Sequence, residues 1–298
     1  LLLTLSRTQK VDLRKISVLE LARQYLTFVE RAKALRLELA ADYLVMAAWL
    51  AYLKSRLLLP PDETDEGPSG EELAAHLAFQ LERLEAMRQR GGYISTRRKP
   101  DGSDSPYELN IAWFDAFGAA DEADRQWQVP SFLLSQIVAL SLRGIPAVYI
   151  HSLLATPNDH IGVERTGLTR AINRRKWDRG ELEGLLADPE CTSGRVFNRY
   201  RRLLQILLRQ PAFHPDAPQR TLSLADGLFG VKRTAGDGSQ RLLAVFNFTR
   251  REQRVALTAL AHDLVAWTEL IGDAAVTIDD GELVLPPYAA FWFSDTRL

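Results

Sequence analysis

The sequence has a single cysteine, almost no net charge and no long uncharged apolar run, and each shortage excludes a class of protein. With only Cys191 available, neither an internal disulfide framework nor an all-cysteine metal site can form, which fits the reducing cytoplasm. A formal net charge of -1 gives no overall basic signal, so we expect no direct nucleic-acid partner.

The hydropathy pattern of the sequence also predicts neither a membrane span nor an export signal. The longest apolar segment, residues 35–59, contains Glu38 and Asp42, whose burial in lipid is costly, so we expect no membrane span. The apolar run at residues 1–5 is followed by basic residues and by no small-residue cleavage site, which is not the pattern of a signal peptide.

Helical patterns fill residues 1–90. A capping box at Ser17 and Glu20 begins one helix, and a second helix over residues 37–58 has an unusually wide apolar surface. Such a surface either binds a partner or packs inside a bundle of its own, and periodicity does not separate the two. The candidate partner-binding residues on it are Leu37, Leu44, Val45, Ala48, Trp49 and Tyr52.

An acidic linker with Gly, Pro and Ser, at about residues 60–70, precedes a third helix that runs to about Arg90. Further on, residues 132–144 predict a helix that ends at Gly144, and the apolar run 145–151 predicts a buried parallel strand. A further amphipathic helix is predicted over 195–210. Helix, buried strand, loop and helix in this order form half of an α/β repeat.

From about residue 221 the hydrophobic period changes to two, which indicates strands. Gly-containing segments at 235–238 and 279–281 separate these runs as hairpin turns. The pattern predicts a small antiparallel β domain over residues 221–298.

Two strings in the first 90 residues, "QKVDLRKISVLELARQYL" (9–26) and "LRLELAADYLVMAAWLAYLKSRLLLPPD" (35–62), closely resemble segregation and condensation protein A (ScpA), the bacterial kleisin. The resemblance implies a helical module that docks on the coiled-coil neck of an SMC ATPase and engages the ScpB partner. It predicts a role in chromosome segregation and condensation.

Residues 92–298 resemble the C-terminal part of sucrose phosphorylase and glucosylglycerate phosphorylase, enzymes of the α-amylase clan (glycoside hydrolase family 13). The strings that carry this are "SPYELNIAWFDAF" (105–117), "LSQIVALSLRGIPAVYIHSLLATPND" (134–159), "TGLTRAINRRKWD" (166–178), "RVFNRYRRLL" (195–204) and "LPPYAAFWF" (285–293). The resemblance implies the last quarter of a (β/α)8 barrel and a C-terminal β domain, with an α-glucoside and inorganic phosphate as ancestral ligands.

The fold class expected is therefore mixed. An all-α N-terminal module (1–90) is followed by a partial (β/α)8-barrel remnant (91–220) and by the small antiparallel β domain (221–298). The seam near residues 88–92 lies inside a helix of one family and a loop of the other, whereas natural fusions usually join whole domains through linkers. This predicts a chimera, and a non-functional chimeric reading frame is one interpretation of it.

A retaining enzyme of this clan needs a carboxylate nucleophile and a carboxylic acid about 5–5.5 Å apart. In the resembled family all three catalytic acids lie upstream of the matched region, so we predict no catalytic residue and no activity for this chain, although its family is enzymatic. Asp101, Asp104, Glu108 and Asp115 cluster in sequence, but turns and caps use Asp routinely. No cofactor and no metal site are expected.

The same resemblance assigns the remaining site residues. Tyr107, Glu108 and Asn110 line the acceptor and phosphate end of the pocket, and Arg170 holds phosphate or the acceptor sugar. A planar guanidinium suits bidentate binding of phosphate oxygens.

Overall fold

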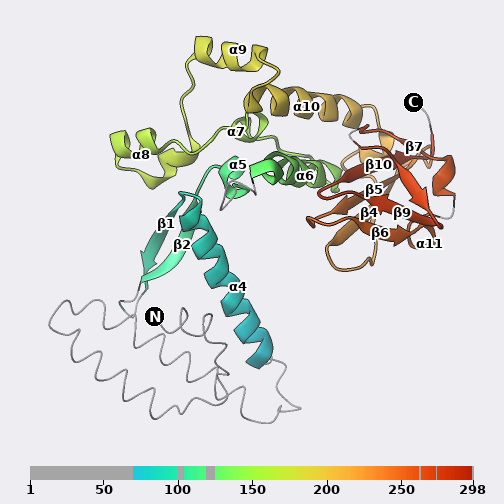
Figure 1. Cartoon of the computed structure of the whole chain (residues 1–298), viewed down its shortest axis with the longest axis horizontal. Coiled ribbons are helices and arrows are strands. Elements are labelled where there is room, and N and C mark those ends of the chain that lie inside the picture. Colours follow the sequence, from blue (N-terminus) through green and yellow to red (C-terminus); the bar gives the residue numbers. More distant parts are fainter. Residues whose placement is uncertain are drawn as a thin grey trace. The chain divides into compact units, whose positions relative to one another are not determined.

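The computed structural model describes residues 70–99, 102, 104–118, 125–261, 263–272 and 274–296 (Figure 1). The expected helices before residue 70, with all six candidate partner-binding residues, lie outside this part. The chain divides into two compact units, one of residues 1–89 and 93–110 and the other of residues 90–92 and 111–298. No helix in the described ranges is long and apolar enough to cross a membrane.

In the first unit, helix α4 (Gly70–Gln89) confirms the third predicted helix. The polar stretch after it contains a hairpin of strands β1 (Tyr93–Arg98) and β2 (Asp104–Asn110). The two strands pair antiparallel with a register shift between Ser95 and Thr96. An ion pair of 3.1 Å between Arg98 and Asp104 closes the hairpin near its turn.

The second unit begins with a helical part. Its helices are α5 (Trp113–Ala116), α6 (Gln128–Ser141), α7 (Ile150–Leu153), α8 (His160–Thr166), α9 (Arg179–Ala187) and α10 (Thr192–Leu207). Short 3-10 turns are η2 (Arg125–Trp127), η3 (Thr169–Asn173) and η4 (Pro211–Phe213). The helices predicted over 132–144 and 195–210 are confirmed as α6 and α10, each shifted by about three residues.

The strand predicted over 145–151 is not formed among the described residues, so that prediction is wrong for this structure. Residues 145–149 form no regular element, and α7 begins at Ile150. A parallel strand needs neighbours for its N–H and C=O groups. The sheets of the described residues are all antiparallel and do not include this segment.

The second unit ends in two antiparallel sheets with the orders β3-β4-β5-β10-β7 and β6-β9-β8. Their strands are β3 (Gln219–Thr221), β4 (Leu228–Thr234), β5 (Arg241–Asn247), β6 (Gln253–Ala256), β7 (Thr268–Glu269), β8 (Thr277–Asp279), β9 (Glu282–Leu285) and β10 (Ala290–Ser294). Helix α11 (Leu257–Leu260) and turn η5 (Leu264–Ala266) connect β6 to β7. The predicted antiparallel β region and both of its hairpin turns are confirmed.

The five-stranded sheet is buried on both faces, because alternate residues of β5 and β10 enter different cores. Leu242, Phe246 and Trp292 pack with residues of α6 and α10, including Leu140 and Leu203. Residues of the opposite parity pack on the three-stranded sheet: Leu243, Val245, Phe291 and Phe293. The alternation arises because successive side chains of a strand point to opposite faces of the sheet.

Two buried polar residues tie the helices to the sheet. The indole N–H of Trp292 donates to Ser141 Oγ at 2.8 Å, at the end of α6. Arg233 of β4 donates to the carbonyl oxygens of Ser141, His214 and Ala217 at 3.1, 2.8 and 3.3 Å. Both side chains are almost completely buried, so these bonds fix the helical part on the sheet.

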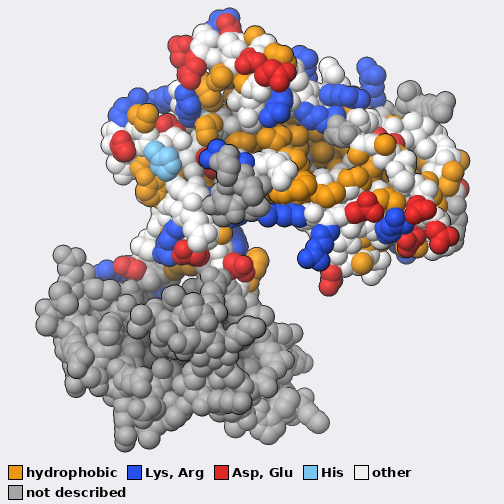
Figure 2. Space-filling model, viewed as in Figure 1, with side chains coloured by type: hydrophobic (Ala, Val, Ile, Leu, Met, Phe, Trp, Pro, Cys, Tyr) orange, Lys and Arg blue, Asp and Glu red, His pale blue; other side chains and the backbone are white. Residues whose placement is uncertain are grey.

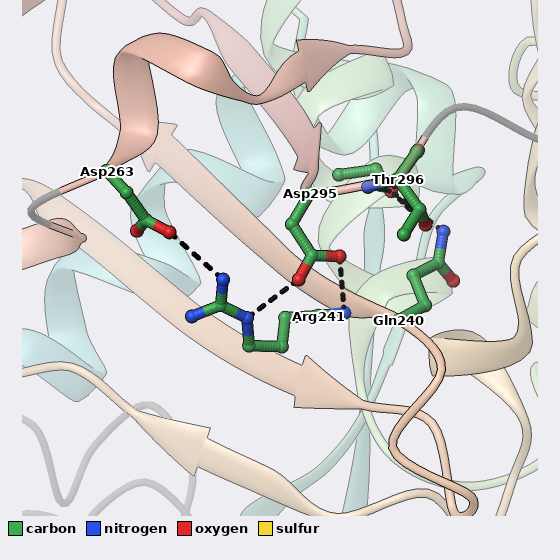
Figure 3. A network of polar contacts seen from close by, with 6 residues as sticks. Gln240, Arg241, Asp263, Asp295 and Thr296 are labelled. Atoms are coloured by element: carbon green, nitrogen blue, oxygen red, sulfur yellow. Dashed lines mark hydrogen bonds and ion pairs between the residues drawn. The ribbon is translucent and has the colours of Figure 1, made fainter.

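A network of polar contacts lies at the start of β5 (Figure 3). Arg241 donates from its backbone N and from Nε to Asp295 at 2.8 and 2.7 Å, and from Nη2 to Asp263 at 3.0 Å. Next to it, the buried amide of Gln240 donates to Gln210 at 2.6 Å and to Ser294 at 2.8 Å. Exposed ion pairs and a buried neutral network thus lie side by side.

Candidate functional site

The densest polar cluster of the helical part forms around Asn158. Its side-chain Oδ1 accepts from the backbone N–H of Ala112 at 2.8 Å, and its Nδ2 donates to the carbonyl oxygen of Arg90 at 3.0 Å. Its backbone N–H donates to Asp115 Oδ2 at 2.6 Å. Asn158 thereby ties Ala112, at the start of α5, to Arg90.

Asp115 is the acid at the centre of this cluster. Besides Asn158, Gln128 Nε2 reaches its Oδ1 at 3.5 Å. Burial raises the pKa of the Asp115 carboxyl, while the hydrogen bonds from Asn158 and Gln128 and the nearby His160 oppose the rise. No other carboxylate is among the groups that shift it. Asp115 is therefore a loop-fixing acid with no described acidic partner.

A second polar group lies in the same loop region. The hydroxyl of the buried Thr156 lies 3.1 Å from His151 Nδ1 and accepts from the indole N–H of Trp177 at 3.1 Å. Burial lowers the pKa of His151, which favours its neutral form. The guanidinium of Arg175 lies 3.9 Å from the centre of the Trp177 ring and pairs with Glu181 at 2.6 Å. These contacts connect residues 151–156 to the segment before α9.

The hairpin of the first unit holds three of the predicted site residues. Tyr107 is exposed, with the Arg97 guanidinium 5.9 Å from its ring centre, and Glu108 is half-buried. Asn110 is buried, and its Nδ2 donates to Ser95 Oγ across the hairpin at 2.9 Å. Asn110 therefore holds the two strands together in this structure.

Arg170 belongs to the second unit, on η3, where its side chain is exposed. The turn is anchored at its C-terminal end: the N–H of Asp159 donates to the carbonyl oxygen of Ile172 at 2.8 Å, and the Tyr149 hydroxyl donates to that of Asn173 at 2.9 Å. The turn thus presents Arg170 from a fixed backbone.

Two of the acids that cluster in sequence are engaged by other groups. Asp104 is bound to Arg98, which lowers its pKa, and Asp115 accepts hydrogen bonds from Asn158 and Gln128. Elsewhere, Asp159 and Asp178 cap α8 and α9. In the described part of the chain, no group of three or more His, Cys, Asp or Glu residues could hold a metal ion.

Asn158 and Thr156 were not singled out as individual residues by the sequence. The signal that could have found them is the polar "TPND" stretch directly after an apolar run.

Comparison with known proteins divides the chain in two. Residues 5–90 match the family model of segregation and condensation protein ScpA. A segregation and condensation protein A from Xylella fastidiosa is 45% identical over 112 residues, which are 38% of this chain and 37% of that protein.

The longer similarity is to a glucosylglycerate phosphorylase from Allomeiothermus silvanus, 37% identical over 227 residues, which are 76% of this chain and 36% of that protein. Among solved structures, the trehalulose synthase MutB from Pseudomonas mesoacidophila MX-45 has a TM-score of 0.45 at 18% identity, over 62% of this chain and 41% of that one.

The two curated matches share some residues, because 76% and 38% together exceed the chain. The chain spans little more than a third of the length of either relative. Both similarities expected from the sequence are thus found, and a chimera is consistent with them. The chain combines a segment similar to segregation and condensation protein A with a longer segment similar to glucosylglycerate phosphorylases.

Proposed function

We propose that residues 91–298 derive from a retaining α-glucoside phosphorylase and that this chain lacks the carboxylates that cleave the glucoside. The 37% identity to a glucosylglycerate phosphorylase supports the ancestry. In this proposal the chain keeps residues for the α-glucoside and for phosphate but does not carry out phosphorolysis by itself.

The environment of Asp115 carries the proposal of inactivity. A retaining mechanism needs a nucleophile and an acid on either side of the scissile bond, about 5–5.5 Å apart. Among the described acids of the second unit, Asp115 is the one whose pKa burial raises, yet both its oxygens are engaged by Asn158 and Gln128. An acid that accepts hydrogen bonds from segments further along the chain, with no second acid beside it among the described residues, fits a structural role.

The remaining site residues keep the roles that the resemblance gives them. Tyr107, Glu108 and Asn110 would face the acceptor, and Arg170 would hold phosphate through its guanidinium. The exposure of Tyr107 and Arg170 leaves both accessible to a ligand.

The experiment is a phosphorolysis assay on the purified full chain. Glucosylglycerate or sucrose is supplied with inorganic phosphate, and glucose 1-phosphate is measured against a heat-inactivated sample. We expect no release above this background. Turnover that scales with protein concentration would refute the proposal.

A second candidate function is carried by the match of residues 5–90 to the ScpA family model. We infer that this segment docks on an SMC coiled-coil neck or on ScpB, with Leu44, Ala48 and Trp49 in the contact. Co-purification of the full chain with an SMC neck fragment, or with ScpB, tests it. Failure to form either complex at micromolar concentration, or equal binding by Ala48→Asp, argues against it.

A further inference from the structure

The segment between α6 and α7 has an apolar side that the described residues leave largely exposed. Ile145 is 85% exposed and Tyr149 48% exposed, whereas Val148 packs on the core formed by α6, α10 and the five-stranded sheet. Exposure alternates along residues 145–149, as in a strand with one face packed and the other open. Figure 2 shows hydrophobic side chains gathered over α6, α7 and α10.

The backbone of this segment is also unpaired. Among described residues, the peptide N–H groups of Ile145, Ala147 and Val148 make no hydrogen bond to another main-chain group. Bonds occur only at its ends, where Gly144 N–H donates to Pro215 and the Tyr149 carbonyl accepts from Ser152 and Leu153. Apolar residues beside unpaired main-chain groups form a template for an added strand.

The sequence indicates what kind of strand fits there. The run "IPAVYI" is apolar on both faces, a pattern typical of a strand covered on both sides in a parallel sheet. Pro146 lacks an N–H, but it stands near the start of the run, where a strand tolerates proline. The second unit thus contains a strand sequence without strand neighbours among the described residues.

We propose that residues 145–149 are a docking site for the polypeptide that makes up the rest of a glucosylglycerate phosphorylase, bound in trans by strand addition. This inference rests on the phosphorylase ancestry proposed above. The match covers only 36% of the length of the Allomeiothermus silvanus relative, so most of that protein has no counterpart in the match. In this proposal the remainder of that protein supplies the neighbouring strands that a parallel-type segment requires on its edges.

The test mixes the full chain with the part of the Allomeiothermus silvanus enzyme that lies outside the matched segment. Binding is measured by titration, and amide hydrogen exchange is followed at residues 145–149. We expect a micromolar complex in which the N–H groups of Ile145, Ala147 and Val148 exchange at least about tenfold more slowly than in the chain alone.

Ile145→Asp should weaken binding about tenfold or more, because strand addition buries the new charge. Leu208→Asp, which adds the same charge at an 81% exposed position at the end of α10, should bind like the unmodified chain. Thermal unfolding of both variants checks that they are folded.

The inference is overturned if no complex forms, if residues 145–149 stay unprotected in the complex, or if both variants bind equally. Protection of these residues in the chain alone also overturns it, since the site is then already occupied. None of these outcomes depends on the activity of the chain alone, which separately tests the proposed function.

Discussion

The Asp115 carboxylate accepts a 2.6 Å hydrogen bond from the backbone N–H of Asn158, 43 residues further along the chain. The side chain of Asn158 in turn accepts a hydrogen bond from Ala112 N–H and donates one to the Arg90 carbonyl oxygen. One carboxylate and one carboxamide therefore hold together the turn before the hairpin, the start of α5 and the loop before α8. A half-buried acid used in this way ties separate segments of the chain together.

Asn158→Ala should lower the free energy of unfolding by about 1–3 kcal/mol, because the Ala112 N–H and the Arg90 carbonyl oxygen lose their partner. Urea denaturation followed by tryptophan fluorescence measures it. Asn198→Ala, at an exposed position of α10, is the matched control and should change stability by less than about 0.5 kcal/mol. Equal effects of the two substitutions would contradict the role given to Asn158.

The raised pKa of Asp115 predicts a pH dependence with a definite sign. Burial raises the pKa above its ordinary value of 3.8, so the folded state binds the proton more tightly than the unfolded state. The contribution of this group is fully present below pH 3.8 and is lost as pH rises through the folded pKa. Relative to Asp115→Asn, the unmodified chain should therefore lose stability from pH 4 towards pH 7.

Unfolding free energies of both proteins in urea at several pH values within that window test this prediction. A difference between them that is independent of pH, or that grows in favour of the unmodified chain, would show that the Asp115 pKa is not raised.

Gln240 and Arg241 are neighbours in Figure 3, yet their substitutions should have unequal effects. Gln240→Ala leaves the buried N–H of Ala212 without its acceptor, which lies 3.0 Å away, and should cost about 1–3 kcal/mol. Arg241→Ala removes ion pairs of a half-exposed side chain and should cost less than about 1 kcal/mol. Chemical denaturation of both variants compares them, and a larger loss for Arg241→Ala would disprove this ranking.

Arg233→Lys should destabilise the second unit by about 2 kcal/mol. Lysine keeps the charge but cannot span the three carbonyl oxygens that the guanidinium binds, and hydrogen bonds to charged groups are worth about 1.5–3 kcal/mol each. Arg220→Lys, at an exposed position of β3, serves as the control. If both substitutions leave the thermal midpoint unchanged, Arg233 does not fix the helices on the sheet.

Periodicity identified α6, α10 and most of the antiparallel strands, because regularly spaced side chains of each pack in a core. The run at 145–149 failed as a strand prediction for a physical reason: its side chains have the strand pattern, but its backbone has no partner strand among described residues. Strand pairing depends on other segments and cannot be read from the run itself.

The site was less predictable than the fold. Asn110 stays a predicted substrate-facing residue, and in the hairpin its Nδ2 also donates to Ser95 Oγ. The polar cluster depends on Asn158 reaching segments 46 and 68 residues away, and no local pattern signals such distant contacts.

The absence of a working nucleophile is tested most directly by mass spectrometry of the intact chain after incubation with a fluorinated α-glucosyl fluoride that traps glycosyl-enzyme intermediates. A retaining enzyme forms a covalent glycosyl carboxylate. Our account predicts an unchanged protein mass. A gain of one glycosyl group per chain, mapped to an Asp or Glu side chain, would contradict it.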